Sequence, residues 1–177
     1  MSIISKKICM VGDFGVGKTS LIRRFVDGQF SDQYLSTVGV KISRKAMELS
    51  AVNPQDKVNV QLLIWDLEGH TKFKGIAPSY LQGSSGAIVV ADVSRNETIE
   101  RISEHIKLFF SVNQKGSIIV ALNKSDLVDE EKLEKLVQIV HNQGLERVSA
   151  IYQTSAKTGL YVDEIFQQLA YKSIAPL

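Results

Sequence analysis

One stretch near the N-terminus decides the fold: Gly12-Asp13-Phe14-Gly15-Val16-Gly17-Lys18-Thr19. It satisfies the pattern G-x-x-x-x-G-K-[ST], follows a strand-like apolar run at Ile8–Val11 and opens a helical stripe of apolar residues. Glycines let such a backbone curl so that successive N–H groups point at phosphate oxygens, and the helix start adds partial positive charge. We expect Lys18 to reach the β- and γ-phosphates of a nucleotide and the Thr19 hydroxyl to bind Mg²⁺. The residues expected to contact nucleotide here are Gly12, Asp13, Phe14, Gly15, Val16, Gly17, Lys18, Thr19 and Ser20.

On either side of this loop, short apolar runs alternate with helical stripes. Runs such as Ala87–Ala91 and Ser117–Leu122 indicate buried parallel strands, and stripes such as Ile99–Phe109 are typical of helices packed on a sheet. This alternation predicts a doubly wound α/β fold. Around Arg44–Val58 two strand-like segments instead follow each other across a proline-containing turn, which predicts a hairpin with an antiparallel edge strand. We expect one domain, residues 1–177, with a mixed six-stranded sheet and helices on both faces.

Composition narrows the class of protein. The 177 residues suffice for one ordinary domain, and a net charge of +2 with scattered basic residues favours neither nucleic acid nor a membrane surface as partner. The single cysteine, Cys9, lies among apolar residues and is expected to be a buried, inert thiol. No signal peptide, membrane span, lipidation motif or intrinsic membrane anchor is visible, so we expect a cytoplasmic location, and the sequence leaves open whether a lipidated tail follows. We also expect a monomer.

A second set of polar motifs favours guanine as the base. Asn123-Lys124-Ser125-Asp126 directly follows an apolar strand, and the Asp126 carboxylate can accept the two N–H donors of guanine N1 and N2. Adenine lacks both donors and would leave that carboxylate desolvated and unpaired. We expect Asn123 to brace the loops and Lys124 to lie over the base. In Ser155-Ala156-Lys157, which follows another strand, the Ala156 N–H is placed to donate to guanine O6.

A third element, Asp66-Leu67-Glu68-Gly69, fits the weak pattern D-x-x-G. Asp66, at a strand end, is expected to hold Mg²⁺ through water, and the Gly69 N–H to sense the γ-phosphate. The motifs therefore begin where four strands end, at Gly12, Asp66, Asn123 and Ser155. Ligands of open α/β sheets bind outside the carboxyl ends of strands, so all of these motifs should meet at one edge.

With these motifs in this order, the chain resembles a Ras-superfamily small GTPase from about Lys6 to Ala170. Segments such as Phe30-Ser31-Asp32-Gln33-Tyr34 and Leu63-Ile64-Trp65-Asp66 are most similar to the Rab branch. The resemblance implies binding of GTP and GDP with Mg²⁺, and hydrolysis of GTP. It also implies that Phe30 packs against guanine, that Thr37 closes on Mg²⁺ and the γ-phosphate, and that effector and regulator proteins bind near Phe30–Val40 and Asp66–Tyr80.

Three residues depart from the family pattern where water attacks. Lys18 is expected to be catalytic because it neutralises charge on the phosphates. His70 stands where the family carries the glutamine that orients water, so His70 is either a second catalytic residue, which positions water, or a surface histidine without that role. Phe14 replaces a small residue near the entry path of an activator's arginine, unless its ring turns outward. Glu68 adds a negative charge near the γ-phosphate. Together they predict slow hydrolysis.

Two other functions are compatible with parts of the sequence. A scaffold that stays GTP-bound without hydrolysis is favoured by the three departures. A small-molecule kinase would use the same phosphate loop, but no arginine-rich lid is recognisable. His105 and His141 lie among polar neighbours and are expected to be solvated.

Overall fold

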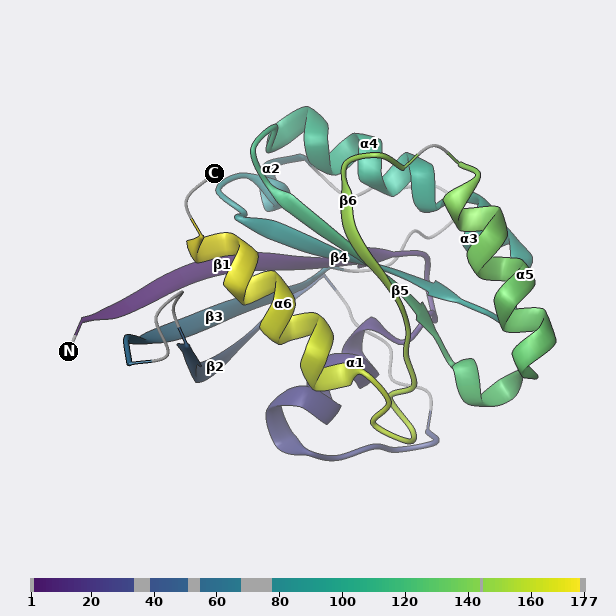
Figure 1. Ribbon diagram of the computed structural model, residues 1–177, viewed down its shortest axis with the longest axis horizontal. Helices are drawn as coiled ribbons and strands as arrows, with labels where there is room; N and C mark the ends of the chain where they lie inside the picture. The colour runs from purple at the N-terminus through teal and green to yellow at the C-terminus, as the bar shows by residue number, and fades with distance from the viewer. Residues whose placement is uncertain (1, 34–38, 51–54, 68–77, 144, 176–177) are drawn as a thin grey trace.

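A single six-stranded sheet organises the chain, with strand order β2-β3-β1-β4-β5-β6 (Figure 1). The computed structural model describes residues 2–33, 39–50, 55–67, 78–143 and 145–175. The strands are β1 (Ile3–Gly12), β2 (Val40–Ser50), β3 (Lys57–Leu67), β4 (Gly86–Asp92), β5 (Ser117–Asn123) and β6 (Val148–Gln153). All neighbours pair in parallel except β2 with β3, so the predicted mixed sheet with an antiparallel edge strand is confirmed.

Helices cover both faces of the sheet. They are α1 (Lys18–Asp27), α2 (Pro78–Leu81), α3 (Asn96–Glu100), α4 (Ile102–Val112), α5 (Glu130–His141) and α6 (Val162–Ile174), with a 3₁₀ turn at Ser125–Leu127. One apolar core lies between the sheet and helices α1 and α6. A second core, on the opposite face, lies between the sheet and helices α2, α3, α4 and α5. The same alternation of side chains along each strand supplies both cores, as expected for a sheet buried on two sides.

The central strands are apolar along nearly their whole length because neither face meets water. Every residue of β4 is buried, and so is every residue of β5 after Ser117. Along β1, Ile8 and Met10 face the α1–α6 core, whereas Cys9 and Val11 face the other. The expectation that Cys9 is buried is confirmed.

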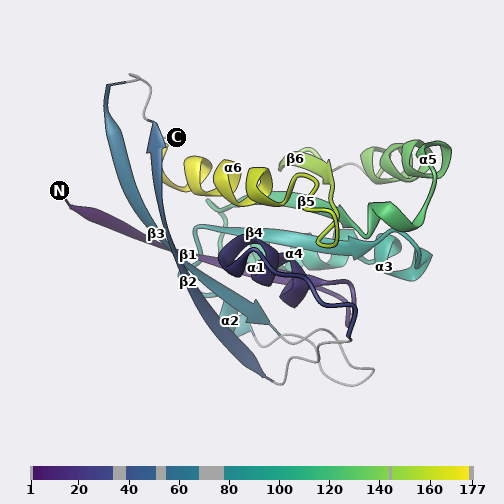
Figure 2. The ribbon, with the colours of Figure 1, turned by 90° about the horizontal axis from the view of Figure 1, so that it is seen from below.

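The edge hairpin differs from the centre in length and exposure. Strands β2 and β3 pair antiparallel from Val40 opposite Leu67 to Ser50 opposite Lys57, and Figure 2 shows them as a long twisted ribbon at the sheet edge. From Ser43 to Glu48, half-buried and exposed residues alternate along β2, which suits a strand with a partner on one side only.

One predicted helix is divided in two. The stripe from Ile99 to Phe109 was expected to form one helix, but α3 ends at Glu100 and α4 begins at Ile102. The intervening Arg101 has φ −87° and ψ −2°, and this ψ departs from the α-helical value by about 40°, so the axis is interrupted locally while the apolar stripe continues. The side chain of Arg101 leaves this junction toward the loop after β1.

The strand ends place the polar motifs together. On the left of Figure 1, β1 begins and α6 ends, and the parallel strands run from there toward the other side of the view. The segments after β1 and β5, and the loop between β6 and α6, therefore all lie at the carboxyl ends of the parallel strands.

Candidate nucleotide-binding site

Glycines shape the loop between β1 and α1. Gly15 and Gly17 adopt φ 74° and 103°, in the left-handed region that side chains rarely occupy. A Cβ on Gly17 would also collide with the side-chain amide nitrogen of Asn123. Glycine at this position thus allows the loop to pack directly against Asn123, the last residue of β5.

Side chains hold five consecutive carbonyl groups of this loop. Lys18 Nζ donates to the carbonyls of Gly12 at 2.9 Å and Asp13 at 2.8 Å. The other bonds are Arg95 Nη1 to Phe14 O at 2.7 Å, Lys124 Nζ to Gly15 O at 2.9 Å and Asn123 Nδ2 to Val16 O at 3.0 Å. Each bond fixes the orientation of one peptide plane, so the loop is held in shape by side chains from several elements.

The ammonium group of Lys18 is buried, and burial disfavours its charged form. Only 6% of the residue is exposed, and burial lowers its pKa from 10.5 to about 8. The nearby carboxylates of Asp66 and Asp13 oppose this effect, whereas the charge of Arg95 adds to it. A buried ammonium of this kind is stabilised when an anion binds beside it.

Two oxygens beside Lys18 suit a hard cation. The Thr19 hydroxyl donates to Asp66 Oδ2 at 2.6 Å, which brings a hydroxyl and a buried carboxylate together at the start of α1. Mg²⁺ prefers such oxygen ligands and is usually held by one or two protein groups together with phosphate and water. Thr19 and Asp66 therefore fit Mg²⁺, while Thr37, the third predicted ligand, lies outside the described residues.

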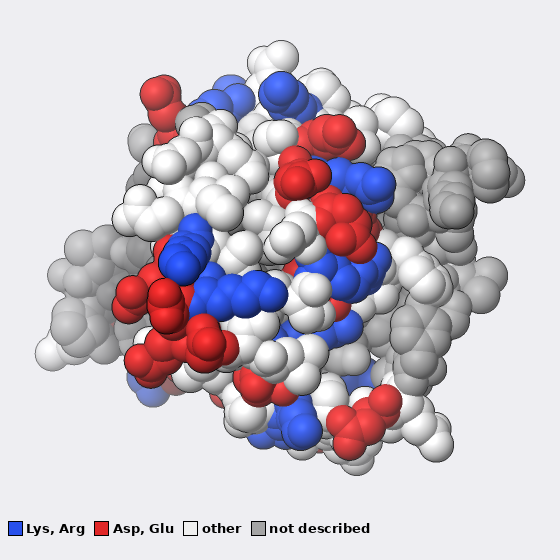
Figure 3. Space-filling model, turned by 90° about the vertical axis from the view of Figure 1, so that its right-hand side faces the viewer, with Lys and Arg blue, Asp and Glu red and all other residues white. Residues whose placement is uncertain are grey.

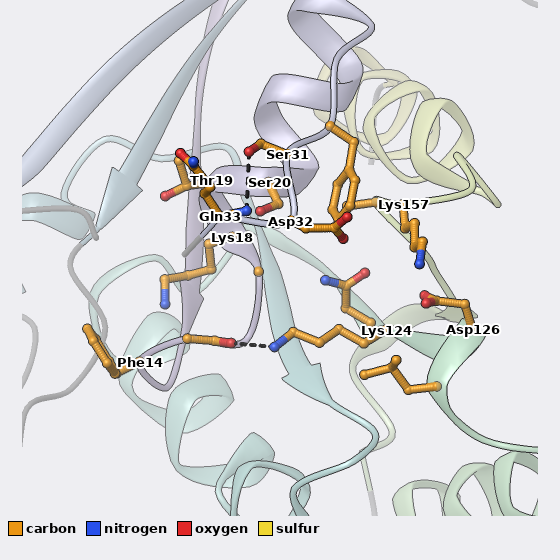
Figure 4. A pocket seen from close by; sticks show the side chains of 16 residues that line it. Phe14, Lys18, Thr19, Ser20, Ser31, Asp32, Gln33, Lys124, Asp126 and Lys157 are labelled. Atoms are coloured by element: carbon orange, nitrogen blue, oxygen red, sulfur yellow. Dashed lines mark hydrogen bonds between the residues drawn. The ribbon is translucent and has the colours of Figure 1, made fainter. Parts of the chain in front are cut away.

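The loop forms one end of a cavity of about 320 Å³ (Figure 4). Phe14 and Lys18 lie toward one end of the view, and Asp126 and Lys157 toward the other. The lining residues come from α1, the loops after β1, α1, β5 and β6, and the 3₁₀ turn: Phe14, Gly15, Gly17, Lys18, Thr19, Ser20, Phe30, Ser31, Asp32, Gln33, Asn123, Lys124, Asp126, Leu127, Ala156 and Lys157. The structure thus brings both sets of motifs to one cavity.

Hydrogen bonds fix the far end of the cavity. Ser155 Oγ donates to Asp126 Oδ1 at 2.7 Å, and Thr154 Oγ1 donates to Asn123 Oδ1 at 3.1 Å. Both donors are fully buried, whereas Asp126 is exposed. The Asp126 carboxylate is consequently oriented by its neighbour while remaining accessible to a ligand.

Lys124 links the two ends. Its backbone has φ 61°, a left-handed conformation that is costly for a residue with a side chain and is concentrated at functional sites. Besides the Gly15 carbonyl, its ammonium contacts Asp92 Oδ2 at 2.9 Å. Burial raises the pKa of Asp92, but hydrogen bonds from Ser94 and Lys124 outweigh burial and leave the pKa lowered.

The expectation that His105 is solvated was wrong. His105 is 6% exposed, and its Nε2 lies 3.0 Å from Oδ1 of Asp13, which is 3% exposed. Arg101 Nη1 donates to the other carboxylate oxygen at 2.9 Å. Burial raises the pKa of Asp13, but His105 and Arg101 together outweigh it, so the net shift is downward. The expectation was met for His141, which is exposed.

Several predicted site residues either are not described by the structure or do not line the cavity. Thr37, Glu68, Gly69 and His70 lie outside the described residues, so their roles remain predictions. Phe14, for which an outward-turned ring was the alternative, is 40% exposed and is among the residues that line the cavity. Gly12, Asp13, Val16 and Ser155 belong to the same loops without lining the cavity itself.

The sequence motifs did not identify the residues that hydrogen-bond to the loops from neighbouring elements. Arg95, Asp92, Arg101 and Thr154 lie outside the short motifs, and only the fold brings them to the site. A signal did exist for His105, because it shares a helical face with Ile102, Ile106 and Phe109 and so lies on the buried stripe of α4.

Comparisons with known proteins agree on one group. Residues 7–126 match the family model described as Ras of Complex, Roc, domain of DAPkinase. Ras-related protein Rab-22A of Homo sapiens is 31% identical over 175 residues, covering 96% of this chain and 84% of the relative. Ras-related protein Rab-13 of Canis lupus familiaris is 30% identical, with 93% and 77% covered. GTP-binding protein ypt5 of Schizosaccharomyces pombe is 32% identical, with 96% and 78% covered.

Proposed function

This chain belongs to the Ras superfamily of small GTPases and is Rab-like within it, and on that premise we propose a guanine-nucleotide switch that hydrolyses GTP slowly. One observation carries the proposal: the phosphate-loop lysine, Lys18, and the guanine-type carboxylate, Asp126, line the same cavity. A cavity with phosphate-type and guanine-type groups at its two ends suits a guanosine di- or triphosphate.

In this proposal the chain's own residues divide the work of binding. Lys18 and the loop amides bind the β- and γ-phosphates, and the buried ammonium neutralises charge that develops there during hydrolysis. Asp126, held by Ser155, accepts the N–H donors of guanine, while the Ala156 N–H donates to O6. Phe30 and Lys124 enclose the base.

Mg²⁺ is part of the proposal because Thr19 and Asp66 offer the oxygen ligands that it prefers. Thr19 and Asp66 would hold the ion, which would supply positive charge to neutralise the phosphates. Thr37 and Gly69 are proposed to contact the γ-phosphate, so that its loss releases the two segments that carry them. His70 is proposed to position the attacking water.

The partners proposed are effector and regulator proteins at the two switch segments. Tyr80 on α2, at 43% exposure, and Trp65 on β3, half-buried, supply aromatic surface near the second segment. Figure 3 shows positive and negative side chains interspersed on the described part of the face at the right of Figure 1, a mixture that does not favour nucleic acid at that face. Within the described residues, no helix has the length and apolarity needed to cross a bilayer. We propose one domain, residues 1–177, acting as a cytoplasmic monomer.

A GTP-bound scaffold remains the second candidate because Phe14 lines the cavity at its phosphate end. An aromatic ring there occupies space that an activator's arginine needs. Hydrolysis would then fail even in the presence of an activator, and the GTP-bound form would persist until exchange or degradation.

Single-turnover hydrolysis of bound GTP with Mg²⁺ separates the two candidates. We expect conversion to GDP with a half-time on the order of an hour or longer, and binding of GDP but not ATP. Phe14→Gly combined with His70→Gln should accelerate the reaction, because the two changes restore space and a water-orienting amide. Tight GTP binding without hydrolysis over days would support the scaffold, and equal affinity for ATP and GTP would refute guanine recognition.

A further inference from the structure

Four of the five held carbonyls in the phosphate loop are bound by residues of the sequence motifs, and the fifth is not. The Phe14 carbonyl accepts from Arg95 Nη1 at 2.7 Å, which is the shortest of the five bonds. Arg95 follows β4 and immediately precedes α3. It belongs neither to the phosphate-binding nor to the base-binding motif.

Peptide geometry links this bond to the nucleotide side of the loop. The described peptide bonds are trans, so the carbonyl of Phe14 and the N–H of Gly15 lie in one peptide plane and point in opposite directions. Phe14 and Gly15 line the cavity, whereas Arg95 contacts the Phe14 carbonyl from the β4–α3 side. A guanidinium that holds the carbonyl on that side holds the Gly15 N–H toward the cavity.

Arg95 is itself well anchored. Its N–H donates to the Asp92 carbonyl at 3.0 Å, and its own carbonyl accepts from the Thr98 hydroxyl at 2.8 Å. Its Nε lies 3.2 Å from Glu97 Oε1, and the side chain is 37% exposed. The guanidinium is therefore aimed by a fixed backbone and a second bond rather than left free at the surface.

The charge of Arg95 acts at the same place. Burial is the main cause of the lowered pKa of Lys18, and Arg95 lowers that pKa further, so the two cations repel each other across the loop. Binding of phosphate between the loop amides and Lys18 relieves that repulsion, because an anion attracts both cations.

We propose that Arg95 is a positioning residue that fixes the Gly15 N–H toward the phosphate chain by holding the Phe14 carbonyl on the opposite side. The inference rests on the proposed function, since it assigns a support to the phosphate half of the same site. Gly15 lines the cavity, and a flipped peptide between Phe14 and Gly15 would present a carbonyl oxygen to phosphate oxygens and repel them.

Binding of GDP and GMP to Arg95→Ala and Arg95→Lys tests this assignment. Arg95→Ala should weaken GDP binding about tenfold, whereas GMP binding, which lacks the β-phosphate, should change less than about twofold. Arg95→Lys keeps an N–H donor and should recover most of the GDP affinity. Lys135→Ala removes the same charge from an exposed site on α5 and serves as the matched control.

An NMR measurement on protein labelled with ¹⁵N-glycine reads the position of the amide directly. In the unaltered chain the Gly15 amide proton should move downfield when GDP binds, and the shift should be smaller in Arg95→Ala. Equal GDP affinity and equal Gly15 shifts in both proteins would overturn the inference and leave the proposed function intact. Equal losses of GDP and GMP binding, or no recovery in Arg95→Lys, would also overturn it. Failure of the unaltered chain to bind GDP would instead refute the proposed function, and the inference with it.

Discussion

Replacing Lys18 with methionine removes a buried ammonium while keeping an unbranched side chain of similar length. Lys18 is 6% exposed as a residue, and burial lowers the pKa of its ammonium from 10.5 to about 8. A lowered pKa on a base means that folding disfavours the charged form. Between about pH 8 and 10.5 the unfolded chain therefore binds more protons than the folded chain, and stability rises with pH across that window.

The size of the effect follows from the two pKa values. At about 1.4 kcal/mol for each tenfold change in the acidity constant, the full difference between 10.5 and about 8 corresponds to about 3 kcal/mol. Raising the pH from 7 to 9.5 covers part of the window and should stabilise the unaltered protein by about 2 kcal/mol relative to Lys18→Met. Loss of the two carbonyl hydrogen bonds in the variant adds an offset that does not depend on pH, so the comparison between pH values removes it.

Urea unfolding of both proteins, freed of nucleotide and Mg²⁺, measures this difference at pH 7, 8, 9 and 9.5. The quantity to follow is the unfolding free energy of the unaltered protein minus that of the variant. We expect it to rise with pH, and to lose this rise when saturating GDP keeps Lys18 protonated in the unaltered protein. If the difference in unfolding free energy stays constant with pH in the absence of GDP, burial does not lower the pKa of Lys18, and the reasoning is refuted.

Three other changes probe separate parts of the site. Gly17→Ala places a Cβ against the Asn123 amide at φ 103° and should abolish binding of a fluorescent GDP analogue, as measured by titration. Asp126→Ala should remove the preference for GTP over inosine triphosphate, which lacks the guanine N2 donor, a preference of roughly 1–3 kcal/mol in competition assays. His105→Ala leaves the buried Asp13 carboxylate with one partner fewer and should lower the unfolding free energy by roughly 1–3 kcal/mol at pH 7.

Matched variants make these outcomes specific. Gly28→Ala meets nothing within 4 Å and should retain GDP binding, although its φ of 66° costs about 1 kcal/mol of stability. His141→Ala alters an exposed histidine and should be neutral. Loss of GDP binding in Gly28→Ala would mean that the Gly17 result is not due to the clash with Asn123, and equal losses in the two histidine variants would contradict the role given to His105.

Periodicity along the chain was enough to predict the sheet, because burial on both faces leaves continuous apolar runs such as β4 and β5. The hairpin was predictable for a different reason, since two strand-like segments stood next to each other without a helix between them. The break at Arg101 was not predictable, because the apolar stripe continues through it and only the backbone angles change.

The site residues predicted from sequence belong to short motifs, in which the spacing along the chain carries the prediction. Those missed act through tertiary contacts, as Arg95 does on the Phe14 carbonyl and His105 on Asp13. Polar neighbours in sequence suggested a solvated His105, but the helical face that it shares with Ile102 determined its environment. A carboxylate from a distant loop then supplied the partner that burial required.

The cavity joins segments that are far apart along the chain, as the bond between Lys124 and Gly15 across 109 positions shows. During synthesis the phosphate loop leaves the ribosome long before Asn123, Asp126 or Lys157. A nascent chain that has exposed only β1 and α1 has glycines and a lysine without the side chains that hold the carbonyls of Gly15 and Val16. The complete cavity therefore exists only late in translation, once the last strand and the loop beyond it are in place.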